Sequence, residues 1–131
     1  VDSAGNKHVI RFAFEGWWMA NLHSFFTEQP TRLNIEILEN SELLMLDRKN
    51  HDKLLEELPA YERYNRIILQ NAYVALQQRV ENALGLTAEE KYDRLIEESP
   101  AFLNRVPLNL VASYLGVSPE TLSRVRGNYN R

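Results

Sequence analysis

The stretch "VASYLGVSPETLSRVR" (residues 111–126) has two short apolar runs at helical spacing on either side of a glycine. Pro107, just upstream, suits the first turn of a helix, and Gly116 permits the positive φ of a tight turn. Ser118 and Pro119 then suit the N-cap and the first position of a second helix. This order of signals predicts a helix-turn-helix.

The second helix of the motif is expected to have one apolar and one polar face. Leu122 and Val125 point inward, toward the small side chain of Ala112, where the two helices cross. The opposite face carries Glu120, Ser123, Arg124 and Gly127, with Arg126 on its flank. A short, polar and basic outer face favours contact with a polyanion.

The outward residues match the chemistry of DNA. Arg124 can donate two hydrogen bonds to guanine, and Glu120 can accept one from cytosine in the major groove. Ser118, Thr121, Arg126 and Arg131, with the helix N-terminus, suit phosphates. The residues predicted to contact DNA are Ser118, Pro119, Glu120, Thr121, Ser123, Arg124 and Arg126. The alternative is an inert helical hairpin in which Arg124 and Glu120 pair across one turn.

The charge of the chain is unevenly distributed. The 131 residues carry a net charge of −3, but residues 1–104 hold 11 Lys and Arg against 17 Asp and Glu. Residues 105–131 hold four Arg against one Glu, a local charge of +3. The chain has no cysteine, which excludes disulfides and thiolate metal sites, and no segment suits a membrane span. We expect a cytoplasmic protein that touches a polyanion at one end.

The first third of the chain has the period-two pattern of strands. Apolar residues alternate in "HVIRFAF" (residues 8–14) and "RLNIEIL" (residues 32–38), and "ELLMLD" (residues 42–47) is a continuous apolar run. The composition of residues 2–7 predicts a turn, with no strand before it. Because three strands make a poor sheet, further strands are expected from a segment upstream of Val1 or from a partner.

From residue 48 the pattern becomes helical. Helices are predicted over residues 48–58, 60–84 and 87–98, the last opened by a Thr87–Glu90 capping box, with a domain boundary at 85–87. The long helix has two apolar stripes, which either pack on both flanks of its own domain or give one stripe to a second subunit. The predicted dimer interface comprises Tyr61, Tyr64, Ile68, Ala72, Ala75 and Leu76.

The C-terminal "RVPLNLVASYLGVSPETLSRVR" resembles the DNA-binding helices of Crp/Fnr transcription regulators, especially their Bacteroidetes-type branch. The resemblance continues through residues 76–100 and 12–48. It implies an α+β fold with a cyclic-nucleotide-binding-like β-roll, a partial double-stranded β-helix of jelly-roll type, at residues 1–58. A long dimerisation helix at 59–85 and a winged-helix-like helix-turn-helix domain at 86–131 would follow. It further implies a homodimer on an inverted-repeat operator, with RNA polymerase as another partner.

The expected effector site departs from that family's pattern. Nucleotide-binding members carry a Gly-Glu-Leu run and an Arg-Ser pair, where this chain has Ala20-Asn21-Leu22 and Thr31-Arg32. The ribose-binding carboxylate is lost, and the arginine is displaced by one position, which turns it to the other face of a strand. The predicted effector is therefore unidentified and not cyclic AMP, or there is none.

Catalysis is not expected. His8, His23 and His51 are scattered without metal-ligand spacing and predict surface or structural roles, and the acidic pairs on the helices point apart. No metal site, nucleophile motif or nucleotide-binding loop is present in the sequence. The predicted function is sequence-specific transcription regulation by a homodimer. The alternative is a ligand-binding or protein-interaction module of the same fold that does not bind DNA.

Overall fold

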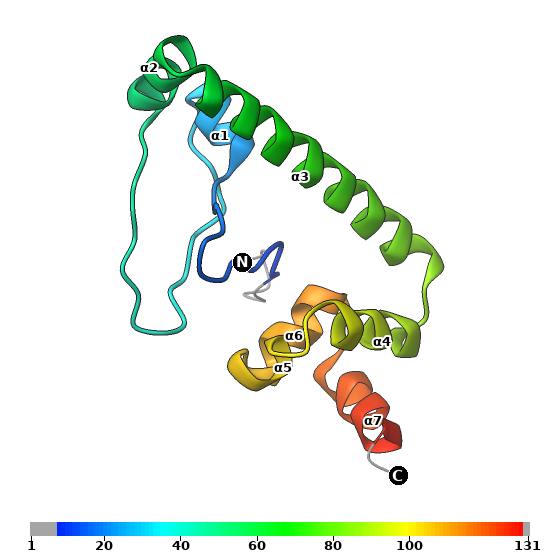
Figure 1. Ribbon diagram of the computed structural model, residues 1–131. Helices are drawn as coiled ribbons and strands as arrows, with labels where there is room; N and C mark the ends of the chain where they lie inside the picture. Colours follow the sequence, from blue (N-terminus) through cyan, green and yellow to red (C-terminus); the bar gives the residue numbers. More distant parts are fainter. Residues whose placement is uncertain (1–7, 130–131) are drawn as a thin grey trace. The chain divides into compact units, whose positions relative to one another are not determined.

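In residues 8–129, the part that the computed structural model describes, the regular secondary structure consists of helices joined by loops (Figure 1). The helices are α1 (Leu22–Thr27), α2 (Arg48–Glu57), α3 (Pro59–Gly85), α4 (Ala88–Glu98), α5 (Phe102–Arg105), α6 (Leu108–Leu115) and α7 (Pro119–Tyr129). The helices predicted from residues 48, 60 and 87 are confirmed within two residues at each end. The predicted turn at residues 2–7 lies outside the described residues, and so does Arg131.

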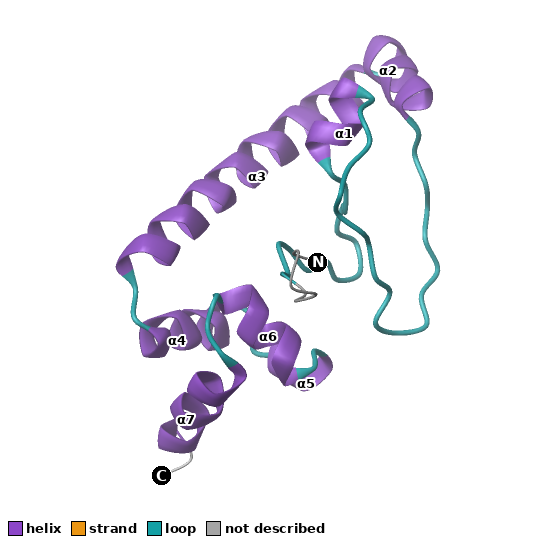
Figure 2. Ribbon diagram, turned by 180° about the vertical axis from the view of Figure 1, so that it is seen from behind, coloured by secondary structure: helices purple, strands orange, loops and turns teal. Residues whose placement is uncertain are grey.

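The predicted α+β fold is wrong, because residues 8–129 contain no strand. The β-roll is absent from that range, and no strand flanks the helix-turn-helix as a wing would. Figure 2 shows a long loop between α1 and α2 in place of the strands predicted at 32–38 and 42–47. Leu44 and Met45 in this loop are 95% and 94% exposed. A strand persists only where a neighbour pairs its backbone groups, and the described residues provide none.

The alternating segment at residues 9–14 packs on helices, not on neighbouring strands. The ring centroid of Phe12 lies 4.7 Å from that of Phe102 and 5.3 Å from that of Tyr114. Phe14 contacts Phe102 at 6.0 Å. A period of two shows only that alternate side chains share one side of an extended segment. Here that side faces helices α5 and α6, so alternate side chains do share one side of the segment, but the segment does not belong to a sheet.

The chain divides into two compact units, one comprising residues 18–77. In this unit the side chain of Asp47 caps α2, as predicted, and that of Asn21 caps the short helix α1. His51 is buried, its Nδ1 lies 2.8 Å from the hydroxyl of Tyr61, and its ring contacts Phe25 edge-to-face. Its role in this unit is therefore structural.

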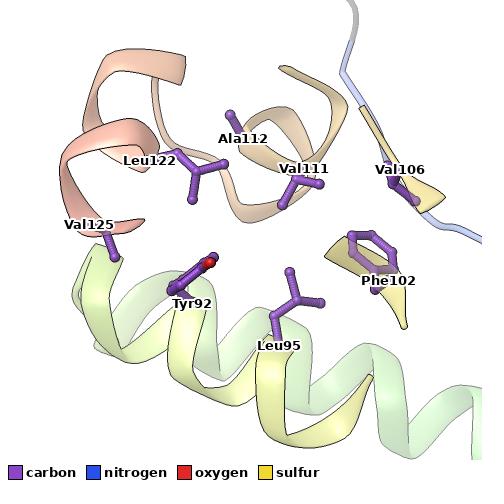
Figure 3. Close-up of a cluster of buried hydrophobic side chains, with 8 residues drawn as sticks. All are labelled: Tyr92, Leu95, Phe102, Val106, Val111, Ala112, Leu122 and Val125. Carbon is purple, nitrogen blue, oxygen red and sulfur yellow. The ribbon is translucent and has the colours of Figure 1, made fainter. Parts of the chain in front are cut away.

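The other unit combines residues 8–17 with residue 78 onward, including helices α4 to α7. α4 packs against α5, α6 and α7, and α6 packs against α7. Figure 3 shows the side chains that meet between these helices. The buried core consists of Tyr92, Leu95, Phe102, Val106, Val111, Ala112, Leu122 and Val125. This core holds α6 and α7 as one body.

Candidate nucleic-acid interface

The turn between α6 and α7 has the geometry that its sequence predicts. Gly116 adopts the left-handed conformation (φ 69°, ψ 33°), and its N–H donates to Ser113 at 3.2 Å, while the N–H of Val117 donates to Ala112 at 3.0 Å. These bonds satisfy the last carbonyls of α6. Ser118 then opens α7, since its hydroxyl accepts from the N–H of Thr121 at 3.1 Å.

The inward face of α7 is confirmed. Leu122 and Val125 are each 1% exposed, and Ala112 on α6 is completely buried. In Figure 3 these side chains lie over Tyr92 of α4. The small residue at Ala112 lets the two helices approach closely, and fully burying a leucine or valine contributes about 1.5–3 kcal/mol. The polar face of α7 is thus held outward by a packed base.

The predicted base-contacting residues lie together on that outward face. Glu120, Ser123 and Arg124 are exposed, and so is Arg126 on the flank. Within the described residues, neither Arg124 nor Arg126 forms an ion pair or hydrogen bond through its guanidinium. Glu120 and Arg124 do not pair across the turn, so the contact expected of an inert hairpin is not formed.

The N-terminus of α7 also controls the charge of its acidic residue. Glu120 accepts a hydrogen bond from its own backbone N–H and one from Ser118, and both bonds lower the pKa of its carboxyl group. Pro119 is exposed, and Thr121 is half-buried with its hydroxyl 3.1 Å from that of Ser118. At neutral pH the face therefore presents an anionic acceptor at Glu120 and a cationic donor at Arg124, one helical turn apart.

The residues predicted for a dimer interface divide into two sets. Tyr61 contacts His51, and the hydroxyl of Tyr64 accepts from the indole N–H of Trp18 at 2.9 Å, so both tyrosines have partners within their own chain. Ile68 and Ala72 are half-buried, whereas Ala75 and Leu76 are exposed. No residue of α3 is buried, and its exposed apolar side chains include Ile67, Tyr73, Val74, Leu76, Val80 and Leu84.

The residues predicted for an effector site meet only in part. The amide nitrogen of Asn21 donates to the hydroxyl of Thr31 at 2.9 Å, and its oxygen accepts from the N–H of Ser24 at 2.9 Å. Ala20, Leu22 and Arg32 are exposed. Asn21, which stands where the resemblance places a ribose-binding carboxylate, therefore serves as a helix cap.

Contacts of residues 8–17 with α5 and α6, and of Arg79 with α6, were not predicted. Arg79 of α3 lies over the ring of Tyr114, and Arg105 forms two hydrogen bonds with Glu15. The sequence signal for these contacts was the apolar alternation that includes Phe12 and Phe14, but this pattern does not indicate which surface the two rings pack on.

Comparison of the chain with protein-family models, with curated proteins and with solved structures finds no match. In residues 8–129 no helix is both long and apolar enough to cross a bilayer. The same residues contain no group of three or more His, Cys, Asp or Glu side chains placed to hold a metal ion.

Proposed function

We propose that the chain is a sequence-specific DNA-binding transcription regulator that uses α6 and α7 as a helix-turn-helix. The observation that carries the proposal is the outward face of α7, where exposed Arg124 and ionised Glu120 stand on a packed helical core. Such a helix fits the major groove of B-DNA, which is about 12 Å wide.

Each exposed residue has a distinct role in the proposal. Arg124 donates two hydrogen bonds to the O6 and N7 of a guanine, and Glu120 accepts from the N4 of a cytosine. Arg126 and the capping turn at Ser118 contact phosphates, which position the helix without reading sequence. The first pair therefore gives sequence preference, and the second gives salt-dependent affinity.

We further propose that the regulator is a homodimer joined through α3. A helix that buries no residue and exposes Tyr73, Leu76 and Val80 at spacings of three and four has the pattern of a two-helix seam. Tyr61 and Tyr64 already contact their own chain, which favours a seam at the C-terminal end of the predicted set, around Leu76, over one at its N-terminal end. Two such subunits would read an inverted repeat whose half-sites lie about 34 Å apart.

A binding site is first selected from a pool of random duplexes. The test then measures the affinity of the protein, over a series of salt concentrations, for duplexes in which each base pair of that site is changed in turn. Arg124→Ala should remove about 1–3 kcal/mol of preference for guanine at one position of each half-site. Arg126→Ala should weaken all duplexes alike and reduce the salt slope of the dimer by about two, one for each subunit. Arg63→Ala, an exposed arginine on α3, is the control and should change neither. An unchanged base preference in Arg124→Ala would refute the reading role of α7.

A second candidate is a protein-interaction module that does not bind DNA. The observation that favours it is the loop between α1 and α2, where Leu43, Leu44 and Met45 are exposed. Exposed apolar patches often mark interaction surfaces. Wild-type protein that binds none of the duplexes would favour this candidate.

A further inference from the structure

Arg79, in the C-terminal part of α3, joins two other elements of its own unit. Its Nη2 donates to the backbone carbonyl of Val9 at 3.1 Å. The central carbon of its guanidinium lies 4.6 Å from the ring centroid of Tyr114 on α6, within the range of a cation–π interaction. The side chain of Arg79 is half-buried, which strengthens both contacts relative to an exposed pair. One cation therefore links α3, residue 9 and the helix-turn-helix.

Residues 9–15, here called the clasp, make polar contacts with α6 at one end and with α5 at the other. At its start, the N–H of Val9 donates to the hydroxyl of Ser113 on α6 at 2.9 Å. At its end, the carboxylate of Glu15 accepts from both terminal nitrogens of Arg105, at 2.7 and 3.0 Å. Val9 is thus held on one side by α6 and on the other by Arg79.

Aromatic contacts fill the space between these two ends. Phe12 and Phe14 pack edge-to-face on Phe102, and Phe12 also meets Tyr114. Phe102 itself is only 3% exposed, so the clasp is continuous with the core that supports α6 and α7. These contacts lie on α5, α6 and the end of α3, whereas the base-contacting residues on α7 are exposed. The clasp therefore restrains α5 and α6 and leaves the polar face of α7 exposed.

The connection from α3 to α4 is short. α3 ends at Gly85 and α4 begins at Ala88. A hydrogen bond from Arg94 to the side-chain oxygen of Asn82 crosses this connection at 2.9 Å and is solvent-exposed. A glycine next to a two-residue connection permits rotation unless other contacts oppose it. Arg79 and the clasp supply that opposition.

We propose that Arg79 is a positioning residue, which holds the helix-turn-helix on the end of α3 through the clasp and so fixes the operator spacing that the dimer accepts. This inference rests on the proposed function. Two reading helices must enter successive major grooves at one separation. A rigid connection favours a single separation and avoids the ordering cost of a flexible one, so spacing selectivity depends on the clasp.

The first test needs no DNA and follows exchange of the Val9 amide hydrogen in the full chain. Arg79→Met keeps the apolar stem but removes the donor and the charge. It should speed Val9 exchange about tenfold, the effect of a 1.4 kcal/mol loss. Arg79→Lys, which keeps the charge and one donor, should restore part of the protection. Exchange at Leu122 of α7 should stay unchanged in both variants. Unaltered exchange at Val9 in Arg79→Met would show that Arg79 does not hold the clasp.

The second test compares duplexes with inverted half-sites at the selected spacing, duplexes with one base pair added or removed, and a single half-site. The affinity of the wild-type protein should fall about tenfold when the spacing changes, whereas that of Arg79→Met should fall less than about threefold. The two proteins should bind the single half-site with equal affinity. A uniform loss on all duplexes would give Arg79 a structural role only and overturn the inference. If the wild type binds no duplex, the proposed function is wrong, and Val9 exchange alone decides whether Arg79 holds the clasp.

Discussion

Replacing Gly116 by alanine isolates the energetic cost of the turn between α6 and α7. Gly116 adopts φ +69°, and a Cβ atom built on it would meet nothing within 4 Å. The cost is therefore backbone strain without a steric clash, about 1–2 kcal/mol for an L-residue in the left-handed region. Gly127→Ala is the matched control, because Gly127 lies inside α7 with the same open space around it. There alanine should stabilise the helix by about 0.5–1 kcal/mol.

The two glycine variants can be compared through hydrogen exchange of the Leu122 amide, which donates to the carbonyl of Ser118 at 3.0 Å. Exchange there reports the opening of α7. Gly116→Ala should speed it about 5- to 30-fold, and Gly127→Ala should slow it about 2- to 5-fold. Gly116→Asn should lie between the wild type and Gly116→Ala, because asparagine tolerates the left-handed region. Equal exchange rates in the two alanine variants would refute the left-handed turn.

Three further predictions concern other parts of the chain. Tyr61→Phe removes the partner of buried His51 Nδ1 and should destabilise the protein by about 1–3 kcal/mol in urea unfolding; Tyr64→Phe, whose hydrogen bond is exposed, should cost less, and an equal cost would contradict this account. The side-chain hydrogen bonds from Arg105, together with a backbone hydrogen bond, lower the pKa of Glu15 from 4.5 to about 2, so the stabilisation by Glu15 is present above pH 4.5 and is lost as the pH falls through 2. The urea-unfolding midpoints of Glu15→Gln and of the wild type should therefore differ at pH 7 and converge near pH 2. A difference that grows in acid would refute the stabilising ion pair between Glu15 and Arg105. Leu76→Glu should weaken self-association in sedimentation while Gln78→Glu, an equal charge at an exposed polar position, should not; a monomeric wild type would refute the seam.

The helix-turn-helix could be predicted from the sequence because its signals are local. Gly116 sets the turn, Ser118 caps the next helix within three residues, and the spacing of Leu122 and Val125 identifies the buried face. Each of these features depends on neighbours within one or two helical turns, so it can be identified from the local sequence alone. The outward position of Arg124 follows from the same periodicity.

The first third of the chain could not be predicted because its structure depends on distant partners. Phe12 packs on Phe102 and Tyr114, about 90 to 100 positions away, and nothing in the alternation of residues 9–14 indicates a helical surface. Residues 32–38 have strand-like alternation and residues 42–47 a continuous apolar run, but neither segment has a pairing partner among the described residues, so both lie in a loop. Periodicity identifies which side chains share a side, and only tertiary packing decides what covers them.

The residues predicted for the dimer interface include two that contact other parts of their own chain, which the sequence pattern of the helix does not show. The wheel places Tyr61 and Tyr64 on an apolar stripe, but His51 and Trp18 already bond their hydroxyls. An apolar stripe on a helix does not distinguish a partner in the same chain from one in another. The proposal of a seam at Tyr73, Leu76 and Val80 therefore depends on the observed contacts of the two tyrosines and on the exposure of the three residues.

The central claim, that α7 reads DNA sequence, is tested most directly by selecting duplexes from a random-sequence pool with the full chain. If α7 reads sequence, the pool should be enriched in an inverted repeat with half-site centres about one helical turn apart, and each half-site should contain a guanine whose preference disappears in Arg124→Ala. Recovery of sequences with no shared motif, or of a motif that Arg124→Ala selects equally well, would contradict it.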